Sequence, residues 1–175
     1  IKTDTRGLGR DAGPADLAAY LYLQPMIDTE ALSDIERAQV PADYFRDFHR
    51  ALEGARVYGR LILSYLGPIR YPDLTAEIAE LLLRLESSFW VVCMGVYEKT
   101  LIISVRTRDR RGGAGRLMQQ VVGQEGVWGG HGTLAGGQIP LRDRDAEDVF
   151  AQSRQRLLRH FGFVSGEQQG RPLFD

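Results

Sequence analysis

Apolar residues recur three or four positions apart in six segments of the chain, the spacing that places them on one face of a helix. Residues that favour helix ends stand at several boundaries. Pro14 suits a first helical position, Asp28 and Asp73 are candidate N-caps, and Gly162 is a natural C-cap. Pro25 ends the first segment. The predicted helices cover residues 14–24, 28–38, 41–52, 73–85, 113–122 and 145–160.

Four shorter apolar runs lack the helical spacing and predict strands, at residues 58–66, 89–97, 100–107 and 134–141. Only Glu98 and Lys99 separate the second run from the third, so a hairpin is the simplest connection between them. Strands and helices are therefore interspersed from residue 57 onward. This order predicts an α/β fold with a mixed sheet of about four to five strands and flanking helices, preceded by a helical connector.

The composition fits a globular chain, because 43% of its 175 residues are hydrophobic. That content supports one domain with its own core, with or without a small attachment. No run approaches the ~20 apolar residues that a membrane helix needs, and the polar first residues do not resemble a signal peptide. The chain begins with Ile1 rather than Met, and we expect it to be an excerpt of a longer protein.

The net charge and the cysteine content limit the class of ligand and the cellular compartment that the sequence favours. The net charge of -1 argues against a protein that holds a long polyanion across a broad basic face. Cys93 is the one cysteine and lies inside an apolar run, which excludes a disulfide within the monomer. A reduced core thiol favours the cytoplasm. The residues fix no oligomeric state, and a homodimer stays open.

The residues with the clearest chemistry lie in a glycine-rich stretch at 128–137 (WGGHGTLAGG). Glycines at this density let backbone N–H groups approach a ligand, and a run of such groups can form a nest for an anion. His131 in the middle can bind an anionic oxygen as a cation or transfer a proton. The plain alternative is a glycine-rich turn with an exposed histidine. The strand predicted at 134–141 favours the functional interpretation, because it places the glycines at a strand entrance.

The stretch also resembles a known motif. Residues 129–131 (GGH) with Ala135 and Gly136, together with the upstream segment 104–107 (SVRT), resemble the C-terminal DHH-associated domain of the DHH phosphoesterase superfamily. The superfamily contains oligoribonucleases that also hydrolyse 3′-phosphoadenosine 5′-phosphate, single-strand exonucleases and cyclic-dinucleotide phosphodiesterases. The chain is closest in type to the bacterial oligoribonuclease and 3′-phosphoadenosine 5′-phosphate phosphatase-like proteins. The resemblance covers nearly the whole chain.

The chain departs from the family pattern at three positions. Trp128 stands in place of a glycine, Leu134 in place of an alanine and Thr107 in place of a serine. Thr107 retains the hydroxyl, so that departure is mild. Trp128 removes a flexible backbone position and adds a flat ring, which either stacks on a base or packs over the sheet edge.

A second, shorter match lies at the start of the chain. Residues 2–5 (KTDT) resemble the last motif of the family's catalytic domain, in which an aspartate ligates a divalent metal. The resemblance thus implies three parts: the end of a catalytic domain at 1–12, a helical linker region at 13–56, and a DHH-associated substrate-binding domain at 57–175. The Asp-His-His motif itself is absent. Mn²⁺ or Mg²⁺ is therefore implied for an intact parent, with Asp4 as one ligand, and none is expected on this part alone.

The resemblance implies that this chain is the substrate-binding part of a metal-dependent phosphoesterase, a hydrolase acting on nucleotides or short single-stranded oligonucleotides. No catalytic set is complete in the chain, so this part alone is expected to be inactive. The guanidinium of Arg106 suits a phosphate. The plain alternative is a solvated arginine beside Arg108, Arg110 and Arg111, which we interpret as a basic lip. The implied substrate-binding residues are Gly129, Gly130, His131, Arg106, Ser104 and Gly136.

Two other functions stay open. One is a non-catalytic nucleotide- or RNA-binding module, as in the related domain of alanyl-tRNA synthetases; the codons upstream of Ile1 would discriminate it from the enzyme. The other is a plain α/β interaction domain, which a His131 buried against core side chains would favour. His49 and His160 are interpreted as structural.

Overall fold

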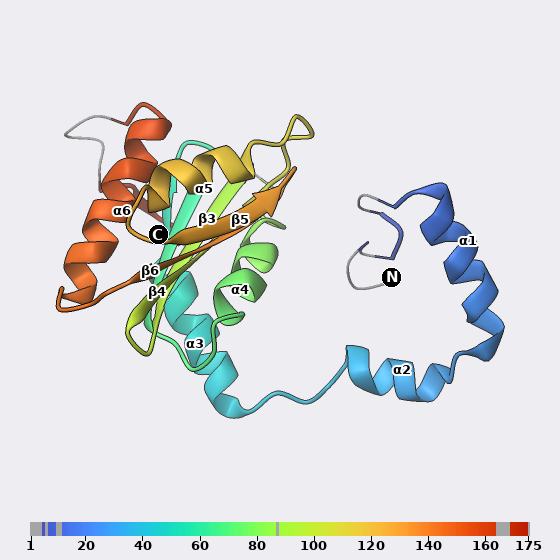
Figure 1. Cartoon of the computed structure of the whole chain (residues 1–175). Coiled ribbons are helices and arrows are strands. Elements are labelled where there is room, and N and C mark those ends of the chain that lie inside the picture. Colours follow the sequence, from blue (N-terminus) through green and yellow to red (C-terminus); the bar gives the residue numbers. More distant parts are fainter. Residues whose placement is uncertain (1–4, 6, 10–11, 87, 164–168, 175) are drawn as a thin grey trace. The chain divides into compact units, whose positions relative to one another are not determined.

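The computed structural model describes residues 5, 7–9, 12–86, 88–163 and 169–174. The chain forms two compact units, Ile1–Pro41 and Ala42–Asp175 (Figure 1). Asp4, the predicted metal ligand, lies outside the described residues. Across the described ranges, none of the helices is long and apolar enough to pass through a membrane.

The first unit consists of short helices whose starts follow the predicted signals. They are α1 (Pro14–Leu23), a 3₁₀ turn (Gln24–Met26) and α2 (Thr29–Glu36). Asp16 accepts a hydrogen bond from the Gly13 backbone N–H at 2.8 Å, and Asp28 accepts from two backbone N–H groups in the first turn of α2. No residue of α1 or α2 is buried, which agrees with a connector that has little core of its own.

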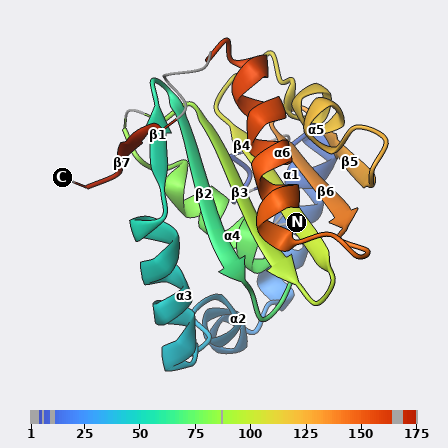
Figure 2. The ribbon, with the colours of Figure 1, turned by 90° about the vertical axis from the view of Figure 1, so that its left-hand side faces the viewer.

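The second unit is built on a mixed seven-stranded sheet in the order β5-β6-β4-β3-β2-β1-β7 (Figure 2). β2 and β3 pair in parallel, and the other neighbours are antiparallel. The α/β class is confirmed, and the predicted hairpin of β3 and β4 is present with Glu98 at φ 52° in its turn. The strands are β1 (Arg56–Tyr58), β2 (Leu61–Pro68), β3 (Trp90–Tyr97), β4 (Thr100–Thr107), β5 (Val127–His131), β6 (Leu134–Pro140) and β7 (Arg171–Pro172).

The sheet has more strands than the four to five predicted. The run at 58–66 contains a turn, because Gly59 takes φ 56° and separates β1 from β2. β5 escaped prediction because all of its residues are exposed and two are glycines, so it carries no alternation of apolar and polar positions. β7 has only two residues, Arg171 and Pro172.

Helices cover both faces of the sheet. α5 (Ala114–Val122) and α6 (Ala146–His160) pack on one face, here the α5/α6 face; α3 (Ala42–Glu53) and α4 (Leu74–Leu82) pack on the other, the α3/α4 face. Figure 2 shows α6 in front of the sheet and α4 behind it. Successive residues of β3 alternate between the two cores: Val92 and Met94 join the first, Val91 and Cys93 the second.

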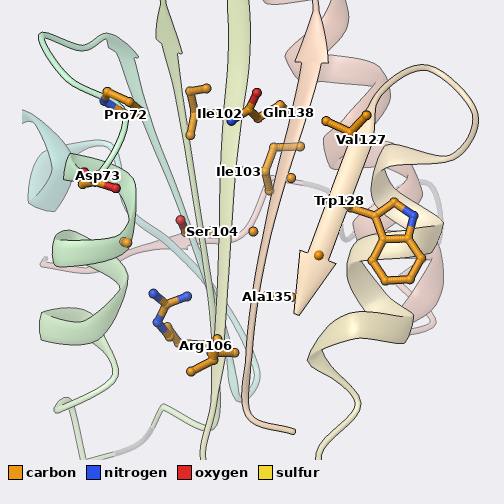
Figure 3. Close-up of a pocket in the computed structure, with 15 residues that line it drawn as sticks. Pro72, Asp73, Ile102, Ile103, Ser104, Arg106, Val127, Trp128, Ala135 and Gln138 are labelled. Carbon is orange, nitrogen blue, oxygen red and sulfur yellow. The ribbon is translucent and has the colours of Figure 1, made fainter. Parts of the chain in front are cut away.

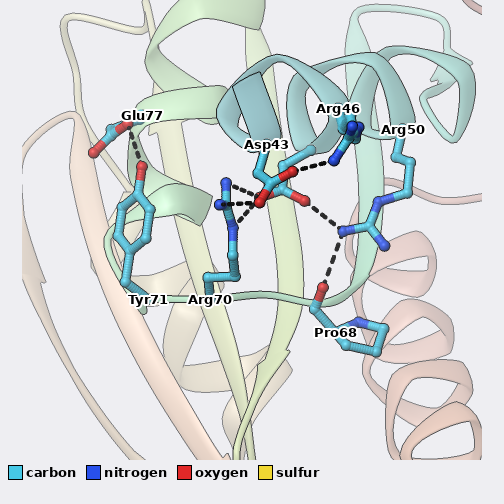
Figure 4. Close-up of polar contacts among 8 residues, drawn as sticks. Asp43, Arg46, Arg50, Pro68, Arg70, Tyr71 and Glu77 are labelled. Carbon is cyan, nitrogen blue, oxygen red and sulfur yellow. Dashed lines mark hydrogen bonds and ion pairs between the residues drawn. The ribbon is translucent and has the colours of Figure 1, made fainter. Parts of the chain in front are cut away.

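Helix α3 belongs to the second unit, whereas the sequence boundary was placed at residue 57. Ala51 is fully buried against the sheet and Phe48 packs beside it. The carboxylate of Asp47 accepts hydrogen bonds from Arg70 at 2.8 and 3.0 Å and from Arg50 at 2.7 Å (Figure 4). Apolar burial fastens α3 to the sheet, and the ion-pair cluster fastens it to the loop after β2.

Candidate functional site

A cavity of about 390 Å³ lies on the α3/α4 face, where β4, β6 and β5 extend past α4 (Figure 3). Its floor comes from these three strands. One wall comes from the start of α4, through Pro72, Asp73 and Ala76. Two of the predicted site residues, Ser104 and Arg106, line the cavity from β4.

The register of the strands arranges the floor as three rows across β4, β6 and β5. Residues two apart on a strand share a face, so each row is separated from the next by one position of the opposite face. From the end of β4 backwards the rows are Arg106, Leu134 and His131; Ser104, Gly136 and Gly129; Ile102, Gln138 and Val127. The middle row carries nothing larger than a hydroxymethyl group, so the centre of the floor is nearly bare backbone.

The two glycines of the middle row are not required by packing. A Cβ on Gly129 would meet no atom of the described protein within 4 Å, and one on Gly136 would meet only the Ile103 carbonyl, at 4.0 Å. Neither residue is among those with positive φ. An ordinary side chain would therefore fit both positions without strain, and it would project into the cavity. Glycine here leaves space for something outside the described protein.

The neighbouring residues Gly137 and Gly130 must be glycine because of close contacts within the protein. A Cβ on Gly137 would lie 2.6 Å from Met118 Sδ and 2.7 Å from Val122 Cγ2 of helix α5. Gly130 has φ 148°, and a Cβ there would lie 2.5 Å from the Leu134 carbonyl oxygen. Gly130, although a predicted ligand-binding residue, is thus also needed for the close approach of β5 to β6.

Arg106 is held in one orientation beside this floor. Its Nε donates to Glu80 Oε1 of α4 at 2.7 Å, and its Nη1 donates to the Val105 carbonyl at 2.9 Å. Only 14% of the side chain is exposed, and burial lowers the pKa of the guanidinium from its usual high value. Among the described residues, Nη2 has no recorded hydrogen-bond partner. The result is a pre-oriented cation at one end of the cavity.

The hydroxyl of Ser104 already has a hydrogen-bond partner within the protein. Its hydroxyl lies 2.9 Å from the Thr75 hydroxyl of α4, and the residue is 5% exposed. This hydrogen bond fastens α4 to β4 at the edge of the bare floor. Ser104 therefore shapes the wall of the cavity as well as lining it.

His131 ends β5 and is exposed, opposite Leu134 in the row of Arg106. The turn after it is fixed, because the Thr107 N–H donates to the Thr133 carbonyl at 2.9 Å and the Ala114 N–H donates to the Gly132 carbonyl at 3.3 Å. His131 is not among the residues lining the cavity. Its role as a ligand stays a prediction, but the burial that would favour a plain interaction domain is not found.

Trp128 does not cover the floor. In Figure 3 its ring lies on the α5 side of β5, away from Arg106. A Cβ on Gly115 at the start of α5 would lie 3.8 Å from the ring. Of the two alternatives raised by the sequence, this arrangement corresponds to packing over the sheet edge.

The basic segment after β4 is also partly neutralised. Arg111 donates to both carboxylate oxygens of Asp109, at 3.2 and 3.1 Å, and these bonds lower the pKa of that carboxyl group. The Arg111 side chain is 90% exposed. This exposed pair fits the interpretation of the segment as a lip rather than a set of fixed contacts.

Two polar residues that line the cavity, Gln138 and Asp73, are not identified as site residues by the sequence, and neither is Glu80, which holds Arg106 in place. Gln138 follows Gly136 by two positions, which is the signal that could have identified it as sharing that face. Asp73 was interpreted as an N-cap, yet it makes no capping hydrogen bond from its side chain. Glu80 could not be identified because the packing of α4 against β4, which brings it to Arg106, is not visible in the sequence.

The described residues contain no group of three or more histidine, cysteine, aspartate or glutamate side chains placed to hold a metal ion. A metal of the kind implied by the resemblance therefore has no fitting site among them.

Known proteins share this fold. An exopolyphosphatase-related protein of Bacteroides fragilis superimposes with a TM-score of 0.67 at 16% identity, over 91% of this chain and 47% of its own. RecJ of Thermus thermophilus, in complex with Mn²⁺, gives a TM-score of 0.51 at 16% identity, over 70% of this chain and 17% of its own. The chain therefore shares its fold with the superimposed parts of these two proteins.

This likeness in fold agrees with the resemblance drawn from residues 104–107 and 129–136. In sequence, the chain is 31% identical over 142 residues to the uncharacterized protein MJ1633 of Methanocaldococcus jannaschii, covering 81% of this chain and 29% of that protein. No protein-family model matches the chain. The chain thus spans less than a third of this relative and about half of the Bacteroides fragilis protein.

Proposed function

We propose that this chain is the substrate-binding part of a DHH-type, metal-dependent phosphoesterase that acts on nucleotides or short oligonucleotides. The observation that carries the proposal is the bare floor at Gly129 and Gly136 beside the oriented guanidinium of Arg106. A cavity with open backbone in its centre and a fixed cation at one end suits a flat ligand with an anionic group.

Arg106 supplies the phosphate contact in this proposal. Its Nε and Nη1 are occupied by Glu80 and the Val105 carbonyl, so the guanidinium cannot swing away from the cavity. A pre-oriented donor loses less conformational entropy on binding than a free surface arginine. His131, at the open end of the same row, can add a second contact to an anionic oxygen, as a cation or as a neutral hydrogen-bond donor.

The catalytic groups would be supplied by the rest of a longer protein. Two-domain closure would then bring them to the phosphate held at Arg106. A near-neutral chain with one oriented arginine holds few phosphates, which favours short substrates over polymers.

The test is to fill the floor without disturbing the fold. A Val side chain at Gly136 projects into the cavity, and we expect it to weaken binding of 3′-phosphoadenosine 5′-phosphate to this chain at least about tenfold, as for a lost contact of about 1.4 kcal/mol. Titration calorimetry measures the affinity and thermal unfolding checks the fold. Thr100→Val, on β4 but outside the cavity, is the matched control.

Unchanged affinity in the stable Gly136→Val variant would reject the site. The chain alone should also show no Mn²⁺-dependent hydrolysis. Robust turnover by it would contradict the proposal that the catalytic groups lie in another part of a longer protein. Binding without turnover in the longer protein would favour the non-catalytic module instead.

A further inference from the structure

The cavity has two chemically different ends. At one end lies Arg106, and at the other lies the third row, where the amide of Gln138 stands between Ile102 and Val127. In Figure 3 Asp73 and Gln138 lie toward the end away from Arg106. The cavity thus has the guanidinium of an ion pair at one end, and a neutral amide with a nearby carboxylate toward the other.

The separation of the ends suits a nucleotide. Ile102 and Arg106 are four positions apart on β4, which at ~3.3 Å per residue is about 13 Å along the strand. Between them lies the row of Ser104, Gly136 and Gly129, where a planar group meets no side chain larger than a hydroxymethyl.

The electrostatics select the orientation. A phosphate near Asp73 would face a carboxylate, whereas at Arg106 it faces a guanidinium. The third row offers instead one neutral amide between two aliphatic side chains. Such a site favours a neutral ring that has both a donor and an acceptor on its edge.

Gln138 is available for such a contact. It is exposed and lines the cavity, and its side-chain amide makes no hydrogen bond within the described part of the chain. An exposed amide that faces a cavity and makes no hydrogen bond within the described residues contributes little to the fold. A role toward a ligand accounts for it better.

We propose that Gln138 hydrogen-bonds the edge of the substrate's nucleobase, so that the nucleotide lies across the glycine floor with its base at Gln138 and its phosphate at Arg106. This inference rests on the proposed function. It makes Gln138 a specificity-determining residue, because a base that cannot match its donor and acceptor leaves the amide unpaired.

The test compares a ligand that has a base with one that lacks it. Adenosine 5′-monophosphate and ribose 5-phosphate are titrated into the wild-type chain and into Gln138→Leu and Arg106→Lys variants. Gln138→Leu should weaken binding of the adenine nucleotide about three- to tenfold, as for one or two neutral hydrogen bonds, and leave ribose 5-phosphate unaffected. Arg106→Lys should weaken both ligands.

A second readout does not depend on any variant. In the wild-type chain, the side-chain amide resonances of Gln138 should shift on addition of the nucleotide and stay in place on addition of ribose 5-phosphate. Equal binding of the nucleotide by wild type and Gln138→Leu, with no such shift, would overturn the inference. If Arg106→Lys and Gly136→Val still weaken binding in that case, the proposed function survives; if the wild type binds neither ligand, both proposals fall.

Discussion

The two faces of strands β4, β6 and β5 show the same residue type used in opposite ways. On the α5/α6 face, Gly137 is a packing necessity, because Met118 and Val122 occupy the space where its side chain would be. On the α3/α4 face, its neighbour Gly136 faces open space. Adjacent glycines in one strand thus carry different information. Glycine indicates a ligand only where nothing in the protein explains it.

The charged groups of the two faces differ in the same way. Beside α6, Glu125 pairs with Arg144 and Arg156, and these hydrogen bonds lower the pKa of its carboxyl group. This cluster ties the loop after α5 to α6, and its residues do not line the cavity beside Arg106. On the other face, the pair of Arg106 and Glu80 borders the cavity. We therefore expect Glu125 to contribute to stability, and we propose that Arg106 contributes to binding.

The largest expected effect concerns the open face. In a longer, active protein, Arg106→Ala and His131→Ala should each raise the Michaelis constant, because a charge-assisted contact of ~1.5 to 3 kcal/mol corresponds to roughly a ten- to 150-fold change. Steady-state kinetics on the phosphoester substrate measures this. Arg111→Ala is the control, since that exposed arginine is paired with Asp109. Normal kinetics in both test variants would reject the site assignment.

The next effect is on stability and separates the two glycines. Gly137→Val should lower the free energy of unfolding by about 1–3 kcal/mol, because its methyl groups overpack the space of Met118 and Val122. Gly136→Val should be neutral or stabilising, since replacing glycine reduces the entropy of the unfolded chain. Urea unfolding of the two variants measures the difference. Equal losses would mean that the two faces are packed alike.

The smallest effect depends on pH. The folded-state pKa of Glu125 lies below its unfolded value of ~4.3, so its contribution is complete above that value and is lost as the pH falls through the folded pKa. Because the group is partly exposed, we expect Glu125→Gln to cost at most about 1 kcal/mol at pH 7. The cost should shrink below about pH 4. Ligand affinity should not change; a loss of affinity would break the contrast between the faces.

The sequence predicted the elements that carry their own periodicity or end signals. The helices at α4, α5 and α6 and the hairpin of β3 and β4 all lie where apolar spacing placed them. β5 was missed because a run of exposed residues with two glycines has no amphipathic pattern, and its strand geometry comes from pairing with β6. Long-range pairing of this kind is not encoded locally.

The residues of the candidate site fall into the same two groups, those that a local motif predicts and those that depend on long-range packing. Motif residues such as Ser104 and Arg106 could be named in advance, and the structure brings both to one cavity. Gln138 and Glu80 could not, because their relevance depends on strand order and on the packing of α4 against β4. The distinction between Gly136 and Gly137 likewise requires knowing which face each residue occupies.

The most direct test of the account maps the bound ligand onto the two faces. The amide spectrum of the ¹⁵N-labelled chain would be followed by NMR during titration with 3′-phosphoadenosine 5′-phosphate. The account predicts the largest shifts at Gly129, Gly136 and Arg106, with Ser153 and other residues of α6 nearly unmoved. Largest shifts along α5 and α6, or no shifts at millimolar ligand, would contradict the assignment of the open glycine floor as the binding surface.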